Sequence, residues 1–537
     1  MRPDATGAPA GGATAPDGVI AAWISGTFRF CLRCGVSYEA VRSNEFGKLV
    51  TLDREGRSSA MSVLASSVLR SLRGIDDPEF PDEARKLLTF VDNRQDASLQ
   101  AGHFNDFALV VQLRSALYRA LKHAGEDGID TLDLGVEVTR ALGLAPADFA
   151  QAPDAIVGLR RTERALRNVI TYRAMRDLQR GWRITLPNLE QTGLLIVDYP
   201  DVVALSEVDS AWADVHPMLA AASPGVRAEI GRVLLDELRR VLAIDAPALT
   251  ADNVDRLRRE SREQLAGLWT VPETEPDPPL GLAIPGSGSK SKPRNALYLS
   301  GRGALGRWLR QPERFGVPLS VDDASHVIEA LLAFLHTQNQ LVQVTEMGET
   351  GYRLNSAAIV LRAGPGEAGA PDPLRRRFED DQRPRVIPFF RDLYLESGRQ
   401  LGGLRAAEHT AQVRPEDRQE RERLFGTEPR RLPLLFCSPT MELGVDIRSV
   451  GARTQSSKRF RIRRRPVPVP AVRAALAGVA GLRAHRRRRW AALPGRQRGW
   501  PAEPGEACGG PRRHPMRRAA TPRRRPVHER RRGLVRP

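Results

Sequence analysis

The segment that most constrains the fold runs from Leu432 to Ile447 and reads Leu-Pro-Leu-Leu-Phe-Cys-Ser-Pro-Thr-Met-Glu-Leu-Gly-Val-Asp-Ile. Its apolar run, Leu434 to Phe436, is short enough to be a buried strand. Pro439 cannot extend a central strand, so the strand has to end before it. A hydroxyl, a glycine and a carboxylate follow, which is how α/β proteins present polar groups at the carboxyl edge of a parallel sheet. The sequence therefore predicts an α/β fold with a parallel sheet.

A second strand is predicted far upstream, at Leu87 to Val91. A polar turn, Asp92 to Asp96, follows it and would cap a helix that runs from Ala97 to about Leu121. A strand, a polar turn and a long helix are typical of the opening unit of a parallel-sheet domain. We expect this strand to share one sheet with Leu434 to Phe436, across a long intervening segment.

These two stretches resemble motifs of superfamily 2 ATP-dependent helicases of the DEAD/DEAH-box type. Pro439 to Ile447 resembles motif V, and Arg85 to Asp106 resembles motif IV. Both motifs belong to the second RecA-like domain of these enzymes, also called the helicase C-terminal domain. The fold class implied is a RecA-like parallel-sheet domain, interrupted by a mainly helical insertion that contains a winged-helix-like unit.

The resemblance also implies roles for individual residues. In motif V, Thr440 would touch a nucleic-acid phosphate, whereas Gly444 and Asp446 would lie at the nucleotide. In motif IV and in the motif between IV and V, the residues implied to contact nucleic acid are Asp92, Arg94, Gln95, His409 and Thr410. Simpler interpretations exist for each: a capping turn after a buried strand, ordinary helix capping, and a structural histidine.

The implied cofactors are ATP and Mg²⁺, which such helicases bind between two RecA-like domains. The sequence has no phosphate loop of the G-x-x-x-x-G-K-[ST] spacing, and Asp82 to Arg85 resembles a DEAH box only superficially. We therefore expect a helicase fragment, cut short at both ends, that does not hydrolyse ATP alone. Its implied partners are nucleic acid, with DNA favoured, and a separate chain that carries the first RecA-like domain.

Cys31 and Cys34 form one Cys-x-x-Cys pair with a glycine after it, the pattern of half a zinc site. Tetrahedral zinc needs four ligands, and the sequence has no second pair. Two reduced cysteines in a turn are the alternative. The four cysteines of the chain suit a reducing cytoplasm better than a disulfide scaffold. No apolar run is long enough for a membrane span.

The composition shifts along the chain and divides it into segments. The predicted segments begin with a disordered start at 1–27 and a Cys-x-x-Cys segment with a helix at 28–82. The RecA-like domain is predicted in two parts, at 83–124 and 386–450. Between these parts lie a helical insertion at 125–270, a linker at 271–295, a winged-helix-like unit at 296–363 and a second linker at 364–385, and an Arg/Pro-rich disordered tail follows at 451–537. The winged unit is predicted from an apolar helix face around Leu331, a strand from Leu341 to Glu346, and a returning strand from Tyr352 to Leu361.

The tail carries all the basic excess of the chain. Residues 451 to 537 contain 25 Arg and one Lys against three Glu, whereas the preceding residues contain 56 basic and 61 acidic side chains. A basic tail binds nucleic acid by releasing counterions. A bias to Arg, Pro, Ala and Gly with one Lys is instead typical of GC-rich codons translated in a wrong frame, and the motif VI that should follow motif V is absent. This pattern favours a frameshift near Ser449 to Thr454.

A second class of function stays open beside the helicase fragment. The winged-helix-like unit and the basic tail together could make a non-enzymatic nucleic-acid-binding protein. Glu346 and Glu349 in the predicted wing make a packing role equally consistent with the sequence. A nonfunctional product of an interrupted gene is the third interpretation.

Overall fold

The computed structural model describes most of the chain between Gly56 and Ser438. The described ranges are 56–77, 80–91, 94–154, 157–179, 186–286, 295–374, 386–396, 404–427, 432–438, 452–455 and 459–461, with the single residues 293, 398 and 401. The fold is mixed α/β, as the sequence predicts. Both the sheet that was expected and two further sheets are present within these ranges.

The first sheet has five strands and joins distant parts of the chain. Its order is β10 (Ala406–His409), β11 (Leu434–Cys437), β1 (Leu87–Phe90), β12 (Ala452–Gln455) and β13 (Arg459–Arg461). The central strand β1 runs parallel to both β11 and β12, with Leu87 opposite Leu434. The expectation that Leu87 to Val91 and Leu434 to Phe436 share a sheet is therefore confirmed.

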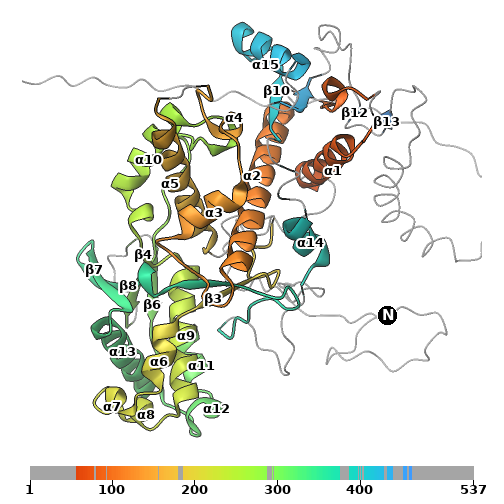
Figure 1. Ribbon diagram of the computed structural model, residues 1–537. Helices are drawn as coiled ribbons and strands as arrows, with labels where there is room; N and C mark the ends of the chain where they lie inside the picture. The colour runs from red at the N-terminus through yellow and green to blue at the C-terminus, as the bar shows by residue number, and fades with distance from the viewer. Residues whose placement is uncertain are drawn as a thin grey trace, which may run out of the picture. The chain divides into compact units, whose positions relative to one another are not determined.

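Helices cover both faces of this sheet. Leu87 and Leu434 point into a core shared with α1 (Gly56–Arg73) and α2 (Arg94–Ala124). Leu88 and Leu435 alternate to the other face, where they pack against Phe425 of α15 (Pro415–Thr427). Because both faces are buried, β1 and β11 are nearly continuous apolar runs, broken only by Thr89 in β1, and do not alternate between apolar and polar residues. Figure 1 shows α15 and α1 near the strands of this sheet.

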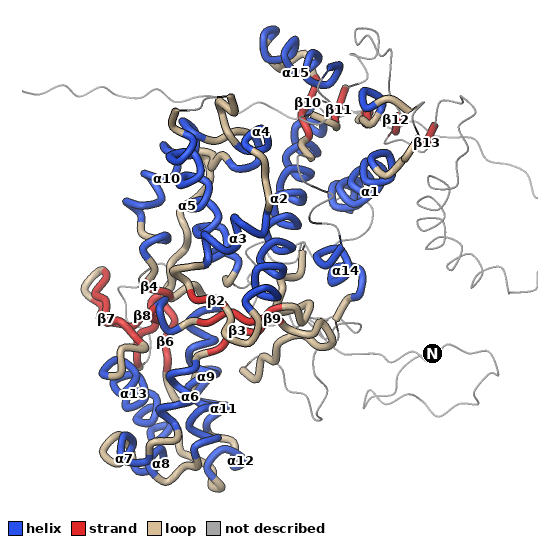
Figure 2. The backbone as a smooth tube through the Cα atoms, in the orientation of Figure 1, coloured by secondary structure: helices blue, strands red, loops and turns tan. Residues whose placement is uncertain are grey.

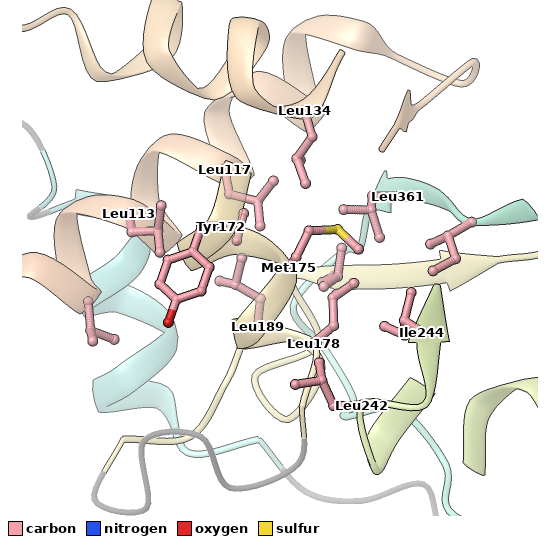
Figure 3. Packing of buried hydrophobic residues seen from close by; sticks show 14 of the residues in the cluster. Leu113, Leu117, Leu134, Tyr172, Met175, Leu178, Leu189, Leu242, Ile244 and Leu361 are labelled. Atoms are coloured by element: carbon pink, nitrogen blue, oxygen red, sulfur yellow. The ribbon is translucent and has the colours of Figure 1, made fainter. Parts of the chain in front are cut away.

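Helix α2 joins the sheet to the helical region that follows. Its first half packs on β10 and β11, and the rest packs on α3 (Leu134–Leu142) and α5 (Leu159–Asp177). Figure 3 shows the resulting core, in which Leu113 and Leu117 of α2 lie near Tyr172 of α5. One helix is thus a structural element of both the sheet and the helical region.

Two smaller sheets combine strands from the predicted helical insertion, the predicted linker 271–295 and the predicted winged-helix-like unit. One contains β2 (Ile129–Asp130), β9 (Val360–Ala363) and β3 (Leu195–Asp198); the other contains β4 (Ile244–Asp245), β8 (Glu349–Asn355), β5 (Leu282–Pro285), β6 (Ala296–Leu299) and β7 (Leu341–Glu346). Strand β5 falls inside the predicted linker 271–295, so that prediction is wrong for Leu282–Pro285. Figure 2 shows these strands among the helices.

The helix and the first strand predicted for residues 296–363 are present, and the winged-helix assignment itself stays a prediction. Helix α13 (Val321–Thr337) begins at a capping box made by Ser320 and Asp323, and β7 and β8 follow it as an antiparallel hairpin. Met347 and Gly348 both have positive φ at the hairpin tip, as a tight two-residue turn requires. The returning strand was predicted too long, because β8 ends at Asn355 and β9 joins another sheet.

The remaining helices build the rest of this region, together with short 3₁₀ turns. Helix α9 packs on α6, α11 packs on α13, α10 packs on α5, and α14 packs on α2. Their bounds, with those of the short helices, are α4 (Pro146–Phe149), α6 (Pro200–Ser206), α7 (Asp209–Trp212), α8 (Pro217–Ala220), α9 (Pro224–Arg240), α10 (Ala251–Gln264), α11 (Ala304–Leu309), α12 (Pro312–Phe315) and α14 (Pro388–Glu396).

A buried ionic cluster stabilises α9 against its surroundings. The Arg239 guanidinium is fully buried and donates to both carboxylate oxygens of Glu190, at 2.9 and 2.7 Å. It also donates to Asp236 and to the Tyr199 hydroxyl. Burial raises the pKa of Tyr199 well above its ordinary value. A buried arginine is tolerated only when paired and hydrogen-bonded in this way.

The tail prediction needs one correction. Strands β12 and β13 lie inside 451–537, the segment predicted to be disordered, and β12 pairs with β1 in register from Ala452 to Gln455. The disorder prediction is therefore wrong for these two strands. The pairing of these strands does not test the predicted frameshift near Ser449 to Thr454.

Candidate functional site at the carboxyl edge of the sheet

The carboxyl ends of β1, β10 and β11 meet at one edge of the first sheet, because the three strands are parallel. Phe90, His409 and Cys437 end their strands there, followed by Val91, Thr410 and Ser438. Ligands of open α/β sheets bind at such edges. The edge thus brings together the strands that lead into each of the motif-like segments.

Arg94 and Gln95 are the predicted site residues that are exposed at this edge. They form the first turn of α2, directly after β1, and both side chains are exposed. Helix α2 has 31 residues, so its first amide groups and its dipole favour an anion at this end. The Arg94 guanidinium adds a positive charge.

His409 lies beneath the surface instead. Its ring is fully buried, and its Nε2 lies 2.6 Å from Oε1 of Glu422 on α15. Its Nδ1 is buried without a hydrogen-bond partner in the described ranges. Thr410 is fully buried as well. Because both side chains are buried, a role in positioning the end of β10 is favoured over direct contact with a phosphate. The predicted phosphate contact of His409 and Thr410 stays a prediction.

Cys437 is opposite His409 in neighbouring strands and lies on the same face. Burial, with a smaller contribution from the negative charge of Glu422, raises the pKa of the Cys437 thiol to about 12. A thiol that stays protonated near neutral pH is a poor nucleophile and a poor metal ligand. A cysteine, a histidine and a carboxylate lie together here, but the Cys437 thiol and the His409 ring are enclosed in the core, and the side chain of Glu422 is partly exposed.

Asn105 fastens α2 to the edge strand β10 and was missed from the sequence. Its Nδ2 donates to the carbonyl of Ala406 at 3.0 Å, and its Oδ1 accepts from the amide of Ala406 at 2.8 Å. The sequence around Asn105 gave no local signal of this contact, because His103 and Asp106 are polar as well. This pair of hydrogen bonds satisfies both backbone groups of Ala406 on the side of α2.

Lys86 fastens α15 in a similar way on the opposite face. Its ammonium donates to the carbonyl of Phe425 at 2.8 Å and lies 4.9 Å from the centre of the Phe425 ring. A cation near the last carbonyls of a helix interacts favourably with the helix dipole. Burial lowers the pKa of Lys86 from its ordinary value, and the charge of Glu83 partly offsets the shift.

Several predicted site residues lie outside the described ranges. They are Cys31, Cys34, Asp92, Thr440, Gly444 and Asp446. Within the ranges that are described, no group of three His, Cys, Asp or Glu side chains is placed to hold a metal ion. The described helices also include none that is long and apolar enough to cross a membrane.

Comparisons of the chain with protein-family models, with curated proteins and with solved structures found no match. The class defined by the fold itself is an α/β protein with a doubly covered, mostly parallel sheet and two further sheets in a largely helical region.

Proposed function

We propose that this chain is a fragment of an ATP-dependent nucleic-acid helicase and supplies the second motor domain, without ATP hydrolysis of its own. The observation that carries the proposal is the parallel pairing of β1 with β11. This pairing joins the two strands that lead into the segments resembling motifs IV and V. In a protein that used them as one motor domain, these strands would have to be neighbours.

The nucleic acid is the partner that the sheet edge suits best. Arg94 and the first amides of α2 would hold a phosphate of the strand, with Gln95 beside them. By the resemblance, Thr440 would contact a second phosphate, and Gly444 and Asp446 would lie at ATP and Mg²⁺. His409, held by Glu422, would keep the end of β10 in place. A RecA-like fold and a winged-helix-like unit are the finer fold assignments that this proposal includes.

The remaining partners follow from what the sequence lacks. Hydrolysis needs a phosphate loop and an acid pair for Mg²⁺, which a separate chain with the first RecA-like domain would supply. Cys31 and Cys34 would supply two of the four ligands of a zinc site.

The proposal is tested by fluorescence anisotropy of a labelled single-stranded oligonucleotide with the full chain. Arg94→Ala with Gln95→Ala should weaken binding about tenfold, since a charge-assisted phosphate contact contributes about 1.5–3 kcal/mol. The salt dependence should fall by about one unit of slope. Arg259→Ala, an exposed arginine of α10, is the matched control and should leave affinity unchanged. Equal affinity of both variants and the wild type would contradict the proposal.

A non-enzymatic nucleic-acid-binding protein is the second candidate, and the charge of the tail favours it. Residues 478–537 contain 18 of the tail's 25 arginines. Truncation after Ala477 keeps β12 and β13. If the second candidate is right, this truncation abolishes binding; if the helicase fragment is right, binding weakens but stays dependent on Arg94. DNA and RNA oligonucleotides of one sequence would identify the preferred strand.

A further inference from the structure

A cavity of about 280 Å³ opens between α5 and α10, and its lining includes none of the sheet-edge residues described above. The start of the 3₁₀ turn Pro247–Leu249, the turn at Thr131 and Leu132, and Ser356 complete its wall. This volume is slightly below the range of pockets that hold drug-sized ligands. The cavity therefore suits a small metabolite.

The floor of the cavity is apolar. Met175 of α5 is 1% exposed, and Leu257 of α10 and Ala246 are also buried. Figure 3 shows Met175 within the hydrophobic core. A rigid apolar floor of this kind accommodates an aliphatic or thioether group and offers nothing to a charged one.

The polar groups of the wall divide into two kinds. The hydroxyl of Thr131 donates to the carbonyl of Ser356 at 2.9 Å, and Nδ2 of Asn253 donates to the carbonyl of Pro247 at 2.6 Å. By contrast, the side chains of Asn168 and Glu260 make no hydrogen bond or ion pair within the described part of the chain. These two side chains are available to a ligand.

Opposite charges stand one helical turn apart on the same side of α10. Arg256 and Glu260 are four residues apart, and both line the cavity. Such a spacing usually permits an ion pair, yet none joins these two residues, because the Arg256 guanidinium donates to Oδ1 of Asn253 instead. The cavity thus has a cationic donor and an anionic acceptor on one wall, each with hydrogen-bonding capacity left over.

We propose that this cavity binds a free α-amino acid with an aliphatic or thioether side chain. Arg256 binds the carboxylate of the ligand, and Glu260 binds its ammonium group. The side-chain amide of Asn168 donates to the carboxylate through its NH2 group and accepts from the ammonium group through its oxygen. The side chain of the ligand packs on Met175 and Leu257. A nucleotide fits less well, since Glu260 repels phosphate and none of the lining residues is aromatic and able to stack on a base.

Isothermal titration calorimetry of the full chain with single amino acids tests this assignment. Leucine, isoleucine or methionine should bind, and N-acetyl-leucine and leucine methyl ester should bind at least about tenfold more weakly, because each lacks one charge. Glu260→Gln and Arg256→Gln should each weaken binding of the free amino acid by a similar factor. Circular dichroism of each variant checks that it is folded.

Matched controls keep the outcome interpretable. Arg259→Gln lies on α10 but does not line the cavity, and Glu329→Gln lies on the exposed side of α13; both should leave affinity unchanged. Three results would overturn the proposal: no heat with any amino acid at millimolar concentration, equal binding of the acetylated or esterified forms, or binding of AMP that depends on Arg256. None of these readouts depends on ATP or nucleic acid, so the proposal fails or stands independently of the helicase assignment.

Discussion

The guanidinium of Arg114 holds the carboxylate of Asp177 through two hydrogen bonds, Nε to Oδ2 at 2.8 Å and Nη2 to Oδ1 at 2.6 Å. Arg114 is 1% exposed and Asp177 is 7% exposed. Arg114 also donates to the Tyr394 hydroxyl at 2.8 Å. One arginine of α2 therefore ties α5 and α14 to the helix that also carries the sheet edge.

Asp177→Asn should lower the free energy of unfolding by about 3–5 kcal/mol, because it leaves the buried charge of Arg114 without its counter-ion. Urea denaturation followed by circular dichroism measures this change. The exposed pair of Arg140 and Glu137 provides the control, and Glu137→Gln should cost at most about 1 kcal/mol. A loss below about 1 kcal/mol for Asp177→Asn would show that Arg114 is adequately solvated or paired without it.

His409→Ala should destabilise the protein without a selective effect on nucleic-acid affinity. The variant removes a fully buried ring and the partner of Glu422, and the expected cost is about 2–4 kcal/mol. Affinity of the folded variant for an oligonucleotide should stay within about twofold of the wild type. A stable variant that has lost affinity would instead make His409 a direct phosphate contact.

Asn105→Ala should loosen β10 from α2. Both backbone groups of Ala406 lose their partner on α2, and the expected loss of stability is about 1–3 kcal/mol. Hydrogen exchange followed by mass spectrometry should show faster exchange in the peptide that contains Ala406–His409. Gln419→Ala, an exposed residue of α15, is the control, and equal acceleration in both variants would contradict this role for Asn105.

Cys437 should make the protein less stable above about pH 9. Its pKa is raised from an ordinary value of 9.0 to about 12 in the folded chain. The thiol therefore ionises first in the unfolded chain, and the free energy of unfolding decreases as pH rises between these two values. At pH 10 this amounts to about 1.4 kcal/mol relative to neutral pH. The difference in pH dependence between the wild type and Cys437→Ala measures it.

The converse result for Cys437 is equally clear. If both proteins lose stability in parallel between pH 8 and about pH 11, the thiol ionises in the folded chain as readily as in the unfolded chain. Its burial against Leu435 and Phe425 would then be wrong.

The pairing of β1 with β11 was predictable because both strands show their burial in the sequence, whereas β12 and β13 were not predicted. Leu434 to Cys437 and Leu87 to Phe90 are consecutive buried residues, and short runs of this kind are typical of strands that are covered on both faces. The two-residue strands Ile129–Asp130 and Ile244–Asp245 carry no periodicity at all. They form because antiparallel and parallel partners elsewhere in the chain offer hydrogen bonds, which no local pattern reveals.

Site residues were predictable only where their place directly after a central strand determines that they are exposed. Arg94 and Gln95 were predicted in the polar turn after a central strand, which places them at the sheet edge, although α2 begins at Arg94 and not at the predicted Ala97. The burial of His409 depends on α15, and the contacts of Asn105 and Lys86 depend on strands and helices hundreds of residues away. Tertiary packing decides which polar residues are enclosed, and local sequence does not encode it.

The measurement that most directly tests this account is a nuclear Overhauser spectrum of the full chain with labelled leucine methyl groups. The parallel register predicts contacts between the methyl groups of Leu87 and Leu434, and between those of Leu88 and Leu435. Leu87→Ile and Leu88→Ile identify the signals. A well-dispersed spectrum should show core contacts such as Leu113 with Tyr172. If it shows these but no contact of Leu88 with Leu435 or Phe425, a single sheet that contains both β1 and β11 is contradicted.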